Sequence, residues 1–227
     1  MLIDAIRREE WFWMFVIFFG SGLGACFYYF FIYRGSGSTL RGFELPGAGS
    51  RQRIKELEAQ IHHLDKAHHH FQLGDIYFGK GKYEKAEQCY RAALEREPCE
   101  IDARAHLGQA LLRQNRALEA KLFLQQVCAE DPKHDYGHSL MAYAETLTAL
   151  EENDAAVAAW QQVLQNNSYA RARVQLAELY AANQKEELAR GEIREILADD
   201  AHAPKFQRQR DRVWVRRAKN LSGTIGK

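Results

Sequence analysis

Residues 70–98 read HFQLGDIYFGKGKYEKAEQCYRAALEREP, and residues 104–132 read RAHLGQALLRQNRALEAKLFLQQVCAEDP. Two later copies keep the same two markers without the closing proline. A small residue follows a large one at Gly74, Gly108, Ala144 and Ala177. An alanine of the second half stands at Ala86, Ala120, Ala156 and Ala189. Both markers advance by 34, 36 and 33 residues, so the sequence predicts four copies of one structural repeat.

Each copy is predicted to form two antiparallel helices. The small residues of the two halves let the helix backbones approach closely, and large residues three or four positions away fill the space between them. Pro98 and Pro132 end the second helices, because proline cannot continue the backbone hydrogen-bond ladder. One such hairpin cannot bury its apolar face alone, so neighbouring copies are predicted to stack into a solenoid.

The first copy reads His70-x2-Leu73-Gly74-x2-Tyr77, Ala86-x3-Tyr90 and Pro98, and it closely resembles the tetratricopeptide repeat family, in its membrane-anchored bacterial type. The resemblance covers residues 67–204 and is strongest in the first two copies. The third copy carries two extra residues, which we place near His134–Tyr136. The resemblance implies an all-α fold, an α-solenoid of about four helix-turn-helix repeats with a C-terminal capping helix, and no enzyme activity.

Residues 11–33 contain no Asp, Glu, Lys or Arg and predict a transmembrane helix. Their length of about 34 Å as a helix is sufficient to span a bilayer. Aromatic residues mark both edges of the run, as interfacial side chains do: Trp11 and Trp13 at one, Tyr29 and Tyr33 at the other. A cleaved signal peptide is the alternative, but the run ends in large aromatic residues rather than a small-x-small site.

Gly20 and Gly24 form a G-x-x-x-G pattern that suits pairing of membrane helices in a homo-oligomer. Ordinary glycines in a single membrane helix are the other interpretation. Residues 20–33 also weakly resemble the membrane segment of cardiolipin-synthase-like phospholipase D proteins. The His-x-Lys motif of that enzyme family is absent from the sequence, so the resemblance implies no activity.

The basic residues around the span indicate its orientation. Two arginines precede it, whereas five basic residues follow it at Arg34, Arg41, Arg51, Arg53 and Lys55. The positive-inside rule therefore predicts a single-pass protein of a bacterial inner membrane with its repeats in the cytoplasm.

The remaining segments complete the predicted order. Residues 1–10 flank the span, and residues 34–50 form a Gly/Ser linker. Residues 51–66 form a helical lead-in or a short coiled coil, since their apolar residues follow 3-4-3 spacing at Ile54, Leu57, Ile61 and Leu64. Residues 205–227 form a basic capping helix and tail, with a predicted apolar stripe of Phe206, Val213, Trp214 and Leu221.

The net charge of +1 conceals a basic C-terminus, because residues 205–227 hold eight Lys/Arg and one acid. Such a tail suits anionic lipid, an acidic protein or the acidic repeats of the same chain. Nucleic acid is not expected as a partner, because no reader motif accompanies the charge. The scattered cysteines, none in a C-x-x-C pair, suit a reducing compartment.

No catalytic, metal-binding or cofactor-binding set stands out. The histidines near residue 69 lack the i, i+4 His pair of helical metal sites, and only Asp65 and His69 have that spacing. The segment Gly223–Lys227 lacks the upstream glycine and the Ser/Thr of a P-loop. The chain is therefore predicted to bind protein rather than to catalyse a reaction.

In the family that the repeats resemble, first-helix residues line the concave groove that binds partners. The corresponding positions here include Phe71, Asp75, Phe78, Gln109, Leu112, Met141, Glu145 and Glu178, and Arg113 and Arg171 lie beside them. Relatives that clamp a carboxylate use Lys and Asn where Phe71 and Asp75 stand, so that ligand is not expected. The apolar and acidic groove predicts a peptide or helix with apolar anchors and basic character.

The leading hypothesis is a membrane-tethered scaffold or adaptor that binds protein partners through this groove. The alternative is an assembly or regulatory subunit that is held in an inner-membrane complex through its transmembrane helix.

Overall fold

The computed structural model describes residues 48–225 of the chain, and the expectations for residues 1–47 lie outside it. Residues 54–227 form one compact unit, which is described here by itself. All regular elements of the described residues are helical. Within residues 48–225, no helix combines the length and the apolar character needed to cross a bilayer.

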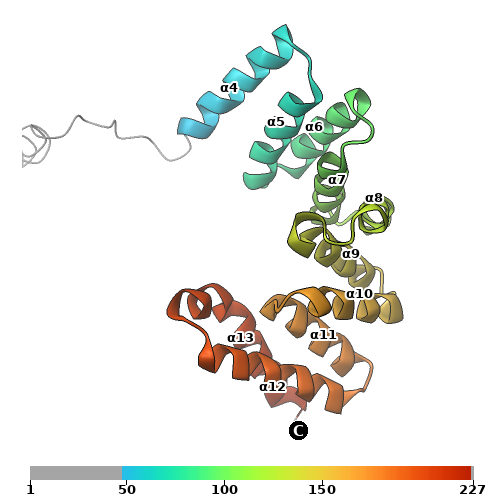
Figure 1. Cartoon of the computed structure of the whole chain (residues 1–227), viewed down its shortest axis with the longest axis vertical. Coiled ribbons are helices and arrows are strands. Elements are labelled where there is room, and N and C mark those ends of the chain that lie inside the picture. The colour runs from blue at the N-terminus through green and yellow to red at the C-terminus, as the bar shows by residue number, and fades with distance from the viewer. Residues whose placement is uncertain (1–47, 226–227) are drawn as a thin grey trace, which may run out of the picture. The chain divides into compact units, whose positions relative to one another are not determined.

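Four helix pairs follow one another along the chain (Figure 1). The first pair is α5 (Ala67–Gly79) with α6 (Tyr83–Arg96), and the second is α7 (Ile101–Arg113) with α8 (Ala117–Glu130). The third is α9 (His138–Ala149) with α10 (Asn153–Asn166), and the fourth is α11 (Ala170–Ala182) with α12 (Glu186–His202). Each helix packs on the next, and α5, α7 and α9 also contact one another in turn. The predicted tetratricopeptide-like solenoid of helix pairs is confirmed.

Two further helices flank these pairs. Helix α4 (Ala48–His63) begins inside the stretch predicted as linker. On it, Leu57 is fully buried, whereas Leu64 lies beyond the end of the helix and is exposed. Helix α13 (Lys205–Ile225) follows the fourth pair and packs on both α11 and α12.

The apolar stripe predicted for α13 is partly wrong. Phe206 and Val213 are 71% and 69% exposed, whereas Val215 and Ala218 are buried with Trp214 packed beside them. At 100° per residue, Phe206 and Val213 point more than a quarter turn away from the buried face. The buried side of α13 is the one that packs on α11 and α12.

The turn inside each repeat has the same backbone conformation. Its left-handed residues are Gly81, Asn115, Glu151 and Gln184, with φ of 70°, 60°, 60° and 58°. The next amide donates to a carbonyl five residues back in every copy, as from Lys82 N to Tyr77 O at 2.9 Å. This is the Schellman closure of a helix. The first copy has glycine and the second has asparagine, the residues that most readily adopt this conformation, whereas Glu151 and Gln184 carry no local signal.

The close approach of paired helices explains the small residues of the repeat. A Cβ added at Gly74 would lie 2.6 Å from Cε1 and 2.8 Å from Cδ1 of Tyr90. The Tyr90 ring cannot easily move, because it is fully buried and its hydroxyl donates to Asp75 at 2.8 Å.

We therefore expect Gly74→Ala to lower the free energy of unfolding by about 1–3 kcal/mol, even though alanine favours a helix. Gly191 lies within α12 with nothing within 4 Å of an added Cβ, so Gly191→Ala should raise stability by about 0.5–1 kcal/mol. Urea denaturation followed by circular dichroism measures both. Equal effects of the two substitutions would contradict the packing argument.

The cysteines in the described residues are free thiols in different environments. Burial, with the nearby Glu58 carboxylate, raises the pKa of Cys89 to about 11. Burial alone raises the pKa of Cys128 to about 12, whereas Cys99 is exposed. Because only the thiolate reacts, we expect Cys99 to be labelled quickly at pH 8, and Cys89 and Cys128 only after unfolding. The rate of thiol alkylation in a Cys26→Ser variant measures this. Fast labelling that remains after Cys99→Ser is added would contradict the expectation.

Candidate peptide-binding groove

Side chains from α7, α9 and α11 enclose a cavity of about 300 Å³ on the face of the first helices. Its lining residues are Gln109, Leu112, Arg113, Asp135, His138, Met141, Ala142, Glu145 and Arg171. Six of the ten groove residues predicted from the sequence therefore meet around one space. They come from three different repeats, which only the stacking of the helices brings together.

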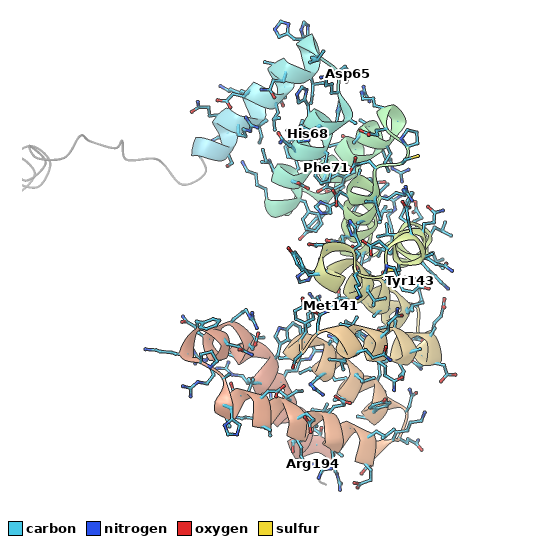
Figure 2. The ribbon with its side chains drawn as sticks, viewed as in Figure 1. Asp65, His68, Phe71, Met141, Tyr143 and Arg194 are labelled. Atoms are coloured by element: carbon cyan, nitrogen blue, oxygen red, sulfur yellow. The ribbon has the colours of Figure 1, made fainter. Side chains whose placement is uncertain are left out.

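A second cavity, of about 500 Å³, continues from the first toward α13. The two share His138, Met141 and Arg171. The second adds Tyr136, Asn167, Tyr169, Ala170, Arg210, Asp211 and Trp214. We call the two cavities together the groove. Figure 2 shows Met141 on α9, at the place where they meet.

The extra residues of the third repeat form a strained turn at the edge of the groove. They lie in the short 3-10 helix η2 (His134–Gly137), where Asp135 and Tyr136 have φ of 48° and 53°. Asn167 Nδ2 and Tyr169 Oη donate to the Tyr136 carbonyl at 3.3 and 3.1 Å. Held in this way, the Tyr136 side chain is 82% exposed. Strained backbone that displays an exposed aromatic side chain is typical of ligand-binding sites.

Two arginines line the first cavity and differ in whether an acidic side chain pairs with them. Arg171 forms an ion pair with Glu145 and lies 5.6 Å from the centre of the Trp214 ring. Burial and the nearby Arg113 charge lower the pKa of Arg171 below its usual range. The structure shows no acidic partner for Arg113 among residues 48–225, and Asp135 likewise has no basic partner there. Arg113 and Asp135 are therefore the charges of this cavity that a ligand can pair.

The three acidic residues predicted for the groove already have partners within the described residues. Asp75 accepts from Tyr90 Oη at 2.8 Å and contacts His106 Nδ1 at 2.7 Å. Glu145 pairs with Arg171, as described above. Glu178 accepts from Arg217 Nη2 on α13 at 2.7 Å. Each acid is already paired by the following repeat or by the cap, so lysine at these positions would remove contacts within the fold as well as repel a basic ligand.

Four predicted groove residues lie outside both cavities: Phe71, Asp75, Phe78 and Glu178. The centre of the Phe71 ring lies 5.1 Å from that of His106 and 5.9 Å from that of Tyr90. The ring centres of Phe78 and Tyr83 are 5.4 Å apart. Figure 2 places Phe71 on α5. Sequence reasoning missed Tyr136, Tyr169 and Trp214; the only signal for the first was the insertion in the third copy.

His134, the first residue of η2, lies between Ser139 and Asp102 in a Ser-His-Asp arrangement. His134 Nδ1 is 2.7 Å from Ser139 Oγ, and His134 Nε2 is 2.9 Å from Asp102 Oδ1. A nucleophilic serine must reach its substrate, but Ser139 is 1% exposed and His134 is 8% exposed. We interpret these contacts as a buried network that holds the turn in place.

The histidines near residue 69 make local contacts. Asp65, expected to face His69, instead lies 2.6 Å from His70 Nε2 and from Arg96 Nη2. These bonds lower its pKa to about 2. No group of three metal-ligating side chains occurs within the residues that the structure describes. The predicted membrane-span residues, Trp11, Trp13, Gly20, Gly24, Tyr29 and Tyr33, lie outside the described residues, as does the segment that resembles phospholipase D proteins.

Comparison with known families supports the assignment of the repeat. Residues 71–135 match the tetratricopeptide repeat family. This stretch includes the second helix of the first repeat and the whole of the second repeat. No curated protein matches the chain. The third and fourth tetratricopeptide-like repeats depart further from the family pattern, which agrees with their missing prolines.

Solved structures of low sequence identity share the fold. "MamA 41-end from Desulfovibrio magneticus RS-1" is 15% identical, with a TM-score of 0.65, and the match covers 70% of this chain and 90% of that one. YrrB, described as a tetratricopeptide repeat protein with an unusual peptide-binding site, is 16% identical, with a TM-score of 0.61 and coverage of 77% and 87%. TTC0263, a tetratricopeptide repeat protein of Thermus thermophilus, is 18% identical, with a TM-score of 0.56 and coverage of 74% and 88%.

Proposed function

We propose that this chain is a tetratricopeptide-repeat scaffold that captures a peptide segment of a partner protein in the groove. The observation that supports this most is the pair of contiguous cavities across α7, α9, α11 and α13, with exposed Tyr136 at their edge. Exposed aromatic residues beside an apolar recess are typical of binding hot spots. The peptide-binding description of the structurally similar YrrB supports the same role.

The charges of the groove define the peptide further. Because Glu145 is paired with Arg171, it does not bias the groove toward basic ligands. Arg113 and Asp135 are open to pairing, and Leu112 and Met141 supply apolar surface between them. The ligand is therefore an extended peptide with an aliphatic or aromatic anchor, an acidic residue directed toward α7 and a basic residue directed toward η2.

A displayed library of random peptides, selected on the full chain, tests this proposal. Selected peptides should share an apolar anchor with residues of opposite charge on its two sides. Enrichment of uniformly basic peptides would contradict the assignment of charges. If the library yields no peptide that binds in the groove, peptide capture itself is contradicted.

The scaffold is proposed to be tethered to a bacterial inner membrane by residues 11–33, with its repeats in the cytoplasm. The support is the uncharged run of residues 11–33 and the basic residues that follow it. The full chain should then resist extraction by carbonate. A C-terminal reporter that is active only outside the cytoplasm would reverse the proposed orientation.

A further inference from the structure

The capping helix α13 has an outward face that contacts no other element of the described fold. Its inward face buries Val215 and Ala218 against α11 and α12. On the outward half, Phe206 and Val213 are about two-thirds exposed and lie seven residues apart, which places them on one line of the helix surface. The cap therefore presents apolar surface to its surroundings.

Four basic side chains occupy the part of the helix surface between buried Val215 and this apolar line: Arg208, Arg212, Arg216 and Lys219. Steps of four, four and three residues place them on one face of α13. None has an acidic partner among residues 48–225. Other arginines of the same helix are neutralised, since Arg217 donates to Glu178 at 2.7 Å and Arg210 donates to Asp211 at 2.9 Å. The tail thus folds back on the repeats with one face and leaves the other face cationic.

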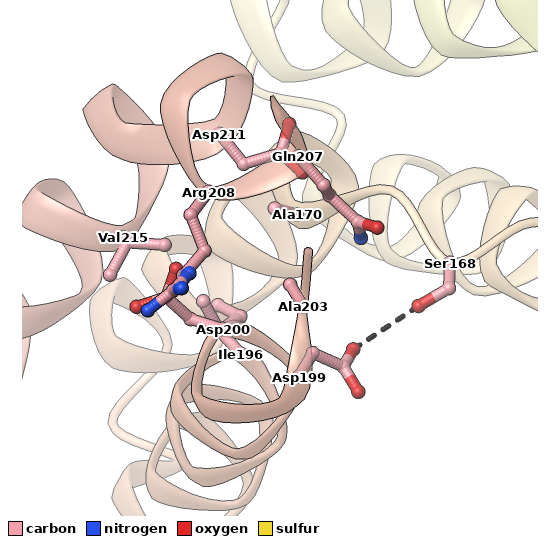
Figure 3. A pocket seen from close by; sticks show the side chains of 10 residues that line it. All are labelled: Ser168, Ala170, Ile196, Asp199, Asp200, Ala203, Gln207, Arg208, Asp211 and Val215. Carbon is pink, nitrogen blue, oxygen red and sulfur yellow. Dashed lines mark hydrogen bonds between the residues drawn. The ribbon is translucent and has the colours of Figure 1, made fainter. Parts of the chain in front are cut away.

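The cationic face is hollowed rather than flat. The four basic residues line a cavity of about 290 Å³ together with Asp200 and Val215. Figure 3 shows the adjoining end of α12, where Ser168 Oγ donates to Asp199 at 3.2 Å. Asp200 is the single acid of the cavity, so the lining keeps a clear excess of positive charge. Arg208 also lines the neighbouring recess of Figure 3, whose acids are Asp199, Asp200 and Asp211, so the positive charge open to an anionic group lies mainly on Arg212, Arg216 and Lys219.

We infer that the outward face of α13 is a docking surface for anionic phospholipid, separate from the groove. The four cations suit headgroup phosphates, and Phe206 and Val213 suit the boundary between headgroups and acyl chains. An acidic protein or a nucleic acid would use the charge but would not require the flanking apolar line. The surface would hold the end of the solenoid against the bilayer while the groove stays open.

The test uses the full chain in lipid nanodiscs, with p-benzoylphenylalanine in place of Phe206. Photolysis should crosslink this position to lipid in discs of phosphatidylcholine mixed with phosphatidylglycerol. In discs of phosphatidylcholine alone, and in the variant Arg208→Gln/Arg212→Gln/Arg216→Gln/Lys219→Gln, the yield should fall about tenfold. Co-elution of the chain with discs of phosphatidylcholine alone reports the proposed tether separately, because docking of α13 requires anionic lipid, so failure of the tether and failure of this surface are distinguishable.

A matched control removes the same number of charges elsewhere: Lys80→Gln/Lys82→Gln/Lys133→Gln/Arg194→Gln. These side chains are exposed and lie off α13, so lipid crosslinking should persist. Equal yields in neutral and anionic discs, or an equal loss in the control variant, would overturn the inference. Preferential crosslinking to an added acidic peptide or single-stranded oligonucleotide would assign the surface to that class and also overturn it.

Discussion

Tyr136→Ala is expected to weaken binding of a selected groove peptide by about 30-fold, which corresponds to about 2 kcal/mol. The side chain stands 82% exposed at the second cavity, so a ligand that packs on it buries nearly the whole ring. Its backbone carbonyl, not its ring, accepts the bonds from Asn167 and Tyr169. The substitution should therefore leave the turn and the stability of the repeats almost unchanged.

Fluorescence anisotropy with a labelled peptide measures this effect. Tyr136→Phe keeps the ring and should retain most of the affinity. Leu118→Ala is the matched control, because Leu118 is 72% exposed on α8 and lines neither cavity of the groove. Unchanged affinity in the folded Tyr136→Ala variant would remove the turn from the binding site.

Trp160→Ala is expected to produce the largest loss of stability, about 3–5 kcal/mol. Trp160 is fully buried in the cluster that joins the third and fourth repeats, and its Nε1 donates to Thr148 Oγ1 at 3.2 Å. Removing the indole leaves a cavity at the centre of this cluster. Because each repeat is stabilised by its neighbours, the third and fourth repeats should unfold before the first two.

Urea denaturation followed by circular dichroism, with hydrogen exchange to locate the opened helices, measures this loss. Trp160→Phe retains most of the buried area and should cost clearly less. Loss of protection spread evenly from α5 to α12 would contradict the expected order of unfolding. A loss below about 1 kcal/mol would mean that the surrounding helices collapse into the space.

The sequence predicted the helix pairs because the required signals are local. Gly74 and Ala86 mark close packing within one hairpin, and Pro98 lies two residues beyond the end of α6. The same register predicted Gln109, Leu112, Met141 and Glu145, which line one cavity, since inward positions recur once per repeat, and it placed Arg113 and Arg171 beside them. Short-range spacing is sufficient for these features, because each depends on a single helix or on two helices joined by a short turn.

Contacts between repeats required the tertiary structure. Asp75 meets His106 and Glu178 meets Arg217, pairs that are 31 and 39 residues apart, and no local pattern indicates which charges will meet. The left-handed conformation of Tyr136 depends on bonds from residues more than 30 positions later. On α13, both Phe206 and Trp214 belonged to the predicted apolar stripe. The packing surface of α11 and α12 decided that Trp214 turns inward and that Phe206 faces outward, because burial depends on the stacking angle between elements.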